Sequence, residues 1–278
     1  MITCRATPDV PMELLRFVTR LLILERRRRC TPAGSRALTC REQAVMVLRR
    51  FRDRTRVEQL GRDHGISRAT AYRYVDEGTE VLAACATDLP EALERAREEG
   101  TPFVILDGKL FSTDRLSEQV TSVKGEAIDA WYSGKHHRPG GNVQAVIRPD
   151  GLPLWASQAE PGHVHDITAA RVHALPALYR AAALGMPTLA DSGYEGAGIG
   201  IHVPVKSPGG SQELAPDNRA RSSLLRGLRF QGERGFALLT QRWASSSTPP
   251  PAPASSPRSS APPSSSPNSS TNTSGENR

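Results

Sequence analysis

The sequence predicts an α/β protein in which an all-α domain precedes a domain of five strands and several helices. Three observations lead to this fold class. Apolar side chains recur at helical spacing between residues 11 and 75. From residue 103 onward, short continuous apolar runs appear instead, as in strands that are covered on both faces. Residues 244–278 hold 13 serines and 8 prolines and no large apolar side chain, so we expect them to be disordered.

The positive charge of the chain is concentrated near its N-terminus. The 278 residues include 36 Lys and Arg against 29 Asp and Glu, which gives a net charge of +7. Residues 1–87 alone contain 17 Arg, no Lys and 10 acidic residues, a net +7, so the remainder is neutral. This distribution is expected when one domain binds a polyanion and another domain has a different task.

Several classes of protein are excluded by what the sequence does not contain. No apolar run approaches the roughly 18 residues of a membrane span, and residues 1–11 lack the apolar stretch of a secretory signal. The four cysteines are scattered, with no Cys-x-x-Cys and no His at zinc-finger spacing. We therefore expect a soluble cytoplasmic protein without a disulfide framework or a structural zinc site.

Two helices are expected before residue 54. The apolar stripe of residues 11–29 predicts the first, and the four arginines at 26–29 are interpreted as its solvated end. The second begins at Thr39, which together with Glu42 has the spacing of a capping box. In this motif the Thr side chain accepts from the backbone three residues on and the Glu side chain reaches back.

Residues 57–75 are typical of a helix-turn-helix. The small Gly61 allows the two helices to cross closely, and Gly65 supplies the positive φ of a tight turn. Ile66 fills the space between the helices and Ser67 caps the second helix. The buried side of that helix is then formed by Ala71, Tyr74 and Val75.

Four side chains of the second helix remain on its outer side, where a recognition helix would meet a major groove: Arg68, Thr70, Tyr72 and Arg73. A helix-turn-helix can also be a purely structural hairpin. The net +7 of the surrounding residues favours DNA binding.

Acidic residues mark the second half of the chain. A charged helix at residues 91–100 is interpreted as a linker, and the apolar strand 103–106 then ends at Asp107 and Gly108. A carboxylate at the end of a buried strand is costly unless it is paired or binds a metal ion, although Asp107 could equally be a turn residue before glycine. Further elements are expected after this strand. The first are a hairpin of strands 142–147 and 152–157 around Asp150-Gly151, a helix at 166–184, and a strand at 187–190 that ends at Asp191. They are followed by an edge strand at 201–206 that contains Pro204, and by a helix at 218–243 that places Arg229 and Glu233 four residues apart.

Four motifs carry a family resemblance: Ile105-Leu106-Asp107-Gly108, followed by Thr113-Asp114-Arg115; residues 161–168, Pro-Gly-His-Val-His-Asp-Ile-Thr; Leu189-Ala190-Asp191-Ser192-Gly193-Tyr194; and Arg229-Phe230-Gln231-Gly232-Glu233-Arg234. With these motifs the chain resembles the DDE transposases of bacterial insertion sequences. The similarity is to the insertion-sequence-five group with a DDE superfamily endonuclease domain, which also includes the eukaryotic Harbinger-type proteins. The Arg-x3-Glu spacing of the last motif is the most specific feature. With the helix-turn-helix, the resemblance covers roughly residues 10–243.

The resemblance implies an RNase H-like fold with a mixed five-stranded sheet flanked by helices. In this fold Asp107, Asp191 and Glu233 would converge as catalytic and metal-binding residues, and Arg229 would support them. Three acids at one point cannot all stay ionised without cations. Two Mg²⁺ or Mn²⁺ ions roughly 3.5–4 Å apart would hold the attacking and leaving oxygens of a phosphodiester in line. The implied partners are double-stranded DNA, both element ends and target, and at least one further copy of the chain, in the bacterial cytoplasm at the nucleoid.

Two histidine-containing segments are candidates for additional binding sites. His163, His165 and Asp166 could form a metal cluster, but residues two apart diverge on a helix, and the resemblance instead places Asp166 at a helix entry as an N-cap. The basic loop at residues 135–138, Lys-His-His-Arg, could contact DNA.

The expected domain organisation is a helical DNA-binding domain at residues 1–95, an endonuclease domain at 100–243 and the tail at 244–278. The family normally continues past Trp243 with apolar helical sequence, whereas here the sequence turns to Ser, Pro, Ala and Thr. We therefore expect the tail to result from a frameshift that truncates the transposase and weakens the support of Glu233. Two alternatives are a helix-turn-helix regulator without catalytic activity, and a metal-dependent nuclease with another role in the host.

Overall fold

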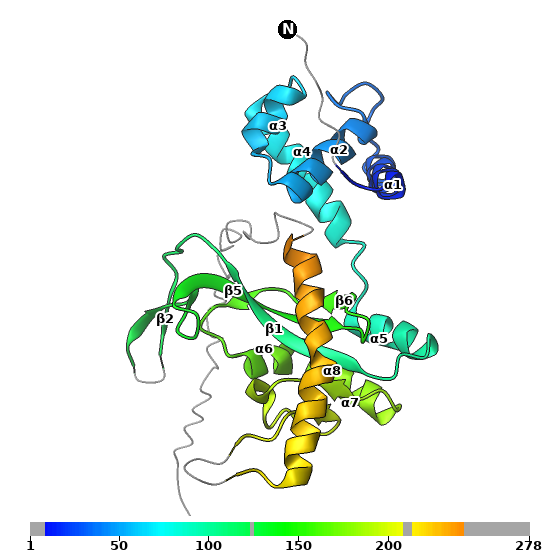
Figure 1. Cartoon of the computed structure of the whole chain (residues 1–278). Coiled ribbons are helices and arrows are strands. Elements are labelled where there is room, and N and C mark those ends of the chain that lie inside the picture. The colour runs from blue at the N-terminus through cyan, green and yellow to red at the C-terminus, as the bar shows by residue number, and fades with distance from the viewer. Residues whose placement is uncertain (1–8, 123–124, 208–212, 242–278) are drawn as a thin grey trace, which may run out of the picture.

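The computed structural model describes residues 9–122, 125–207 and 213–241 (Figure 1). Within these ranges helices α1 to α5 come first, the strands follow, and the long helix α8 closes the described chain. No helix in this part of the chain is long and apolar enough to cross a membrane. The tail predicted at residues 244–278 lies outside the described residues.

The first four helices pack into a bundle with two apolar clusters. One cluster joins α1, α2 and α4, and the other joins α2, α3 and α4. The capping box predicted at the start of α2 is confirmed, because the Thr39 hydroxyl accepts from the Glu42 backbone and the Glu42 carboxylate accepts from the Thr39 backbone. The helices are α1 (Met12–Arg28), α2 (Cys40–Asp53), α3 (Val57–Asp63) and α4 (Arg68–Ala83).

Three of the four arginines at the end of α1 are exposed, as predicted for a solvated helix end: Arg27, Arg28 and Arg29. Arg28 and Arg29 both pair with Glu25 at the surface. Arg26 differs, because it is half-buried and donates to the Leu38 carbonyl at 3.0 Å and to Gln43 Oε1 at 2.8 Å.

Helix α5 (Leu89–Glu98) is not the linker that its charged sequence indicated. Leu89, Leu93 and Ala96 are buried in the apolar cluster that contains Val104 and Leu106 of the sheet. In Figure 1, α5 accordingly lies beside the sheet, and the connection from the N-terminal bundle runs between α4 and α5. The charged residues of α5 occupy the opposite, solvent-facing side.

A mixed sheet forms the centre of the second half of the chain. β1 lies between β5, with which it is antiparallel, and β8, with which it is parallel; β9 follows β8 in parallel at the edge. Three short strands share the other side of β5, so the sheet is five strands across, and a separate ribbon is formed by β2 and β3. The strands are β1 (Val104–Ser112), β2 (Gln119–Thr121), β3 (Ala127–Asp129), β4 (Tyr132–Ser133), β5 (Arg138–Ile147), β6 (Pro153–Ala156), β7 (Glu160–Pro161), β8 (Thr188–Leu189) and β9 (Ile201–His202).

The main departure from the sequence prediction concerns the first strand. β1 does not end at Asp107 but continues to Ser112, paired throughout with β5, so Asp107 lies in the middle of a strand and is not a turn residue. The hairpin between β5 and β6 is confirmed, with Gly151 at φ +83° in the turn. β9 lies at the edge of the sheet as predicted, but it ends at His202, so Pro204 is not part of the strand.

Helices cover both faces of the sheet. On one face α8 (Pro216–Gln241) packs through Phe236 against Ile105 and Ile147. The other face is covered by α5, α6 (Asp166–His173) and α7 (Leu175–Ala183). The single helix predicted for 166–184 is thus two helices, because the chain bends at Ala174 (φ −126°, ψ −45°) and Pro176 follows in the first turn of α7. The result is the three-layer arrangement of an RNase H-like domain.

Candidate active site

Asp107 is held between β1 and α8. Its side chain lies on the same face of β1 as Ile105, since residues two apart on a strand share a face. A Cβ placed on Gly232 of α8 would lie 3.2 Å from Ile105 Cγ2 and 3.9 Å from Asp107 Oδ2. The small residue at 232 therefore lets α8 approach the carboxylate. Asp107 Oδ1 accepts a hydrogen bond from the backbone N–H of Gly108 at 3.0 Å.

Asp191 reaches the same place through the parallel pairing of β8 with β1. Val104 is opposite Thr188 and Ile105 is opposite Leu189. If this register is continued by two residues on each strand, Asp191 lies beside Asp107. Here β8 has ended, and the Asp191 carboxylate caps a short 3₁₀ turn, Ser192–Tyr194, by accepting from the Gly193 N–H at 2.8 Å. The predicted meeting of these two aspartates is therefore seen in the structure.

The electrostatics of Asp107 reflect a carboxylate that is largely out of water and close to other acids. Burial raises its pKa to about 6; the Arg229 guanidinium opposes this rise, and the carboxylates of Asp191 and Asp166 add to it. Arg229 Nη2 lies 3.9 Å from Asp107 Oδ2, and both side chains are about one-fifth exposed. Arg229 is therefore the partial counter-charge of Asp107.

Glu233 lies apart from the two aspartates. It is exposed on α8, where it lines a shallow hollow with Lys109 and Phe230. Its neighbour Gly232 is the residue that faces Asp107. Among the residues that the structure describes, no group of three His, Cys, Asp or Glu side chains is arranged to hold a metal ion. The structure thus brings together Asp107, Asp191 and Arg229 but leaves Glu233 one position away on the helix.

Asp166 belongs to a buried chain of polar side chains that the sequence did not predict. Asp166 is not the N-cap of α6 but its first residue, while His165 takes the cap position without a side-chain bond. Asp166 Oδ1 accepts from Asn142 Nδ2 at 2.9 Å, and Gln144 Nε2 donates to Asn142 Oδ1 at 3.0 Å. The buried Tyr194 hydroxyl donates to Gln144 Oε1 at 2.6 Å, which completes the chain.

One signal for this polar chain is present in the sequence of β5. Asn142 and Gln144 alternate with apolar residues in a strand that otherwise reads as buried. Buried amides of this kind need partners, and on one face of a strand they indicate a polar site rather than a plain core. Burial and the nearby acids Asp166, Asp107 and Asp191 raise the pKa of Tyr194, so its phenol stays protonated and can act as the donor.

A cleft of about 800 Å³ opens beside Asp166. Its wall includes aromatic and basic side chains, namely Arg115, Tyr132, Lys135 and His136. Lys135 and His136 belong to the basic loop at residues 135–138. Among the described residues His163 is not part of a group arranged to hold a metal ion; its Nδ1 is 2.6 Å from the Ala130 carbonyl oxygen.

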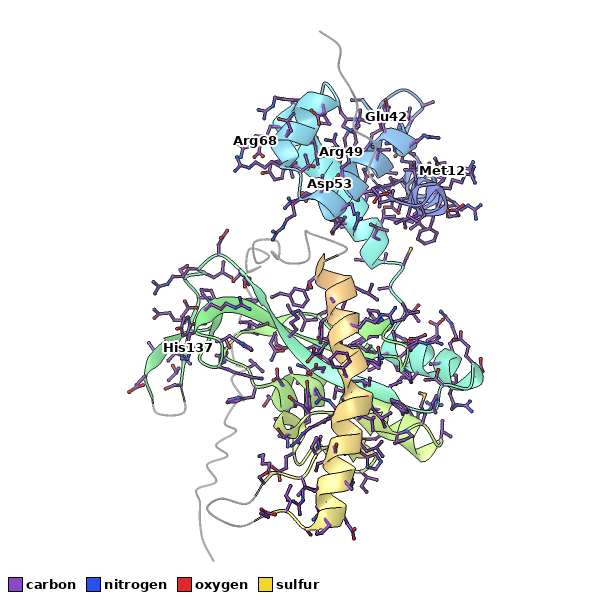
Figure 2. The ribbon with its side chains drawn as sticks, in the orientation of Figure 1. Met12, Glu42, Arg49, Asp53, Arg68 and His137 are labelled. Carbon is purple, nitrogen blue, oxygen red and sulfur yellow. The ribbon has the colours of Figure 1, made fainter. Side chains whose placement is uncertain are left out.

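The helix-turn-helix has the predicted local geometry. Gly65 has φ +67°, the Ser67 hydroxyl accepts from the Thr70 N–H at 3.2 Å, and a Cβ on Gly61 would lie 3.2 Å from Ala71 Cβ. Arg68 projects from the outer side of the bundle (Figure 2). Of the other three proposed recognition residues, Tyr72 and Arg73 are exposed and Thr70 is half-buried.

These outward side chains are tied to acids and to one another. Glu58 Oε1 accepts from the Tyr72 hydroxyl at 2.9 Å and pairs with Arg68 Nη2 at 3.2 Å. Arg73 Nη2 donates to Thr70 Oγ1 at 3.1 Å. Glu58 thus neutralises part of the surface that would meet a phosphate backbone.

Comparison with protein-family models identifies both halves of the chain. Residues 36–88 match the helix-turn-helix of DDE superfamily endonucleases. Residues 106–256, more than half of the chain, match the DDE superfamily endonuclease model, and this match extends beyond Trp243 into the predicted tail. Comparisons with curated proteins and with solved structures gave no match. The order of the two matches agrees with a helical bundle followed by an RNase H-like sheet, and the chain belongs to the DDE superfamily endonucleases.

Proposed function

We propose that this protein is a DNA transposase of the bacterial insertion-sequence type, which binds the ends of its element and cleaves and joins DNA strands with divalent metal ions. The observation that carries this proposal is that Asp107 on β1 lies beside Asp191, which follows the end of the neighbouring parallel strand β8. This pair lies in a chain whose N-terminal bundle is a helix-turn-helix with a net charge of +7 over residues 1–87.

The residues at the sheet fit a magnesium or manganese site in their chemistry. Mg²⁺ is bound in proteins mainly by carboxylate oxygens and retains positions for water and phosphate. Burial raises the pKa of Asp107, the carboxylates of Asp191 and Asp166 add to this rise, and Arg229 offsets only part of it. Asp107 and Asp191 would hold the metal ions, with Glu233 as the third ligand. When bound, the ions would activate an attacking oxygen and stabilise a leaving oxygen.

The side chains of the chain itself have three tasks in this proposal. Arg68, Thr70, Tyr72 and Arg73 bind the element end through the major groove. Arg229 offsets negative charge beside Asp107 and steadies a scissile phosphate. The cleft beside Asp166 receives a DNA strand, since the cationic Arg115 and Lys135 suit a phosphate backbone and the exposed ring of Tyr132 suits a base.

Strand cleavage of a labelled element-end duplex tests the proposal. With Mg²⁺ or Mn²⁺ the wild-type protein should nick the duplex and leave a 3′-OH, and Glu233→Gln should abolish nicking. Glu99→Gln serves as the matched control, because Glu99 pairs with Arg148 at 2.6 Å at the other end of β5. If nicking survives in Glu233→Gln, Glu233 is not a metal ligand. If wild-type protein binds but never nicks, the transposase proposal fails for this chain.

A helix-turn-helix regulator is the second candidate, favoured by the separation of Glu233 from the two aspartates. A regulator would retain its function when Asp107 and Asp191 are replaced. A nuclease with another role in the host would cut DNA but would not join the 3′-OH to target DNA. A joining assay with a target plasmid therefore separates these candidates from the transposase.

Three finer features belong to the same proposal. Bringing two element ends together needs at least a dimer of this chain, and the site of action is the nucleoid. We also propose that residues 244–278 derive from a shifted reading frame, on the basis of their composition alone. Translation of the other frames downstream of the Trp243 codon tests this, and the absence of an apolar helical continuation there would contradict it.

A further inference from the structure

The outer face of α1 combines cations with large apolar side chains. Leu15, Val18 and Leu22 are buried in the bundle, and the opposite face of the helix is exposed. Phe17 and Leu24, two helical turns apart on that face, are 49 % and 52 % exposed. Within the described part of the chain, the arginines beside them form no ion pair: Arg16, Arg20 and Arg27. Exposed apolar anchors flanked by cations are the composition of a binding surface.

An apolar groove lies between α5 and α7. Its volume is about 400 Å³, and the side chains that line it include Pro90, Leu93, Ala177 and Ala181. Leu184 also lines the groove and is exposed. An apolar groove that is open to water in a single chain is a place where a second surface can be buried.

Acidic side chains flank this groove on α5. Glu94 lines the groove, and Glu98 lies one turn further along the helix; both are exposed. The pair between Glu94 and Arg97, at 3.3 Å, is a surface ion pair of little energetic weight, so Glu94 can exchange it for another arginine. Arg16 and Arg20 are also one turn apart on α1. The two sets of charges therefore match in sign and in spacing.

The α7 side of the groove carries a cation that α1 can match as well. Arg180 lines the groove and is exposed. The first turn of α1 contains the exposed Glu13, four residues before Phe17. Neither Arg180 nor Glu13 has an ion-pair partner among the residues that the structure describes. The outer face of α1 thus offers charges of both signs to a groove that carries both.

We propose that α1 of one copy of this chain packs into the α5–α7 groove of a second copy, and that the second copy returns the same contact. Phe17 and Leu24 fill the apolar groove, while Arg16 and Arg20 pair with the acids of α5. Such a contact is a helix that places its anchors, spaced by whole turns, into a hydrophobic groove.

A second copy is the occupant that the surfaces favour. The two complementary surfaces belong to one sequence, and both are open to solvent in a single chain. A contact that is returned closes a two-fold dimer, whereas one that is not returned would continue into a filament. A stable interface buries roughly 1,200–2,000 Å², and returning the contact doubles the area that one helix in one groove can bury.

This dimer leaves the proposed DNA-binding surfaces accessible. Figure 2 shows Met12 of α1 and Arg68 of α4 on opposite sides of the bundle. In Figure 1, α5 and α7 lie to the right of the sheet, whereas β2 and the His137 loop labelled in Figure 2 lie to the left. The inference deepens the proposed function and rests on it in one respect, since two copies are what holding two element ends requires.

Light scattering coupled to size-exclusion chromatography tests the inference on the full chain, without DNA or metal ions. The wild type should be a dimer. Reversal of charge on α1, Arg16→Glu with Arg20→Glu, should weaken dimerisation at least tenfold, and so should Glu94→Arg with Glu98→Arg on α5. All four side chains are exposed, so the fold should tolerate both double variants.

A mixture of the two charge-reversed proteins gives the sharpest result. In the mixture the reversed α1 of one protein meets the reversed α5 of the other, and the two unchanged surfaces meet as well. Dimers should therefore reappear when the two proteins are combined, which misfolded proteins could not do.

The apolar part of the contact has a matched control. Leu24→Ser should weaken dimerisation at least tenfold, because an anchor in the groove is lost. Leu224→Ser changes a leucine of α8 that is 63 % exposed, on the other face of the sheet, and should leave the dimer unchanged. Equal effects of the two substitutions would contradict the assignment of the surface.

Other outcomes overturn the inference without touching the proposed function. A monomeric wild type, or a mixture that stays monomeric, contradicts the dimer. If Arg16→Glu with Arg20→Glu remains dimeric but binds duplex DNA less tightly, the outer face of α1 binds the DNA backbone and not a second copy. A monomer that still nicks the element-end duplex contradicts the dimer surface alone, whereas a dimer that binds and never nicks contradicts the transposase proposal alone.

Discussion

The carboxylate of Asp166 fills the space into which a side chain at Gly108 would project. A Cβ added to Gly108 would lie 2.6 Å from Asp166 Oδ1 and 2.7 Å from Gln144 Nε2. Both groups belong to one hydrogen-bonded chain, so neither can move aside without breaking a bond to Asn142. The glycine after Asp107 is thus required by close packing across β1 and not by a turn.

Gly108→Ala should therefore destabilise the protein by about 1–3 kcal/mol, as overpacking of a filled site does. Gly227→Ala is the control, since a Cβ at Gly227 in α8 meets nothing within 4 Å. That change should raise stability by up to about 1 kcal/mol through helix propensity. Urea unfolding measures both, and equal effects of the two substitutions would contradict the packing account.

The raised pKa of Asp107 predicts a pH-dependent cost to stability. Its folded-state pKa of about 6 lies above the ordinary value of 3.8, so the folded state binds the proton more tightly. The contribution of Asp107 to the stability of the metal-free protein is then fully present below about pH 4 and is lost as the pH rises through 6, a loss on the order of 2–3 kcal/mol.

Asp107→Asn should remove this loss. In EDTA the variant should be more stable than the wild type at pH 7.5 and nearly equal to it at pH 4, as measured by urea unfolding. Addition of Mn²⁺ should stabilise the wild type alone, because only its ionised carboxylate binds the ion. A constant difference between the two proteins from pH 4 to 7.5 would show that Asp107 titrates as an ordinary surface acid.

Glu58 should restrain DNA binding by the helix-turn-helix. Its carboxylate holds Arg68 and the Tyr72 hydroxyl, and it places a negative charge beside the proposed phosphate-binding surface. Glu58→Gln should raise affinity for duplex DNA about threefold to tenfold in fluorescence anisotropy. Glu91→Gln, which breaks the Arg95 pair on α5, should leave the affinity unchanged. A lower affinity for Glu58→Gln would mean that Glu58 orients the recognition side chains instead.

The roles of Arg68 and Arg73 in DNA binding can be distinguished by replacing each with Ala and measuring how the loss of affinity depends on salt concentration and on the duplex sequence. Replacement of a phosphate-binding arginine by Ala should weaken binding to all duplexes alike and reduce the salt slope by about 1. Replacement of a base-reading arginine should cost about 1–3 kcal/mol for the element end only. Each variant should follow one of these patterns. Unchanged binding in both variants would remove α4 as the recognition helix.

The sequence predicted best those features that depend on neighbouring residues. The positive φ of Gly65, the cap at Ser67 and the capping box of Thr39 are set within a few residues, and all are present. Asp107 and Asp191 were also found together, because each follows an apolar run that the sheet pairs in parallel.

Features that depend on distant contacts could not be predicted. β1 continues past Asp107 because β5 pairs with it, and this partner begins at Arg138, some distance along the chain. Helix α5 has a charged sequence, yet its few apolar residues face a core that only the folded chain creates. The position of Asp166 depends on Asn142, Lys135 and the gap at Gly108, which no local pattern connects.

A divalent-metal site at Asp107 and Asp191 is tested most directly by iron-dependent cleavage of the chain. Fe²⁺ replaces the metal, and ascorbate and peroxide are added, so that hydroxyl radicals cut the chain near the ion. We expect cuts close to residues 107 and 191 and none in α2 or α3. Asp107→Asn should suppress these cuts, and excess Mg²⁺ should compete them away. Cuts at other places only, or cuts that Asp107→Asn leaves unchanged, would contradict it.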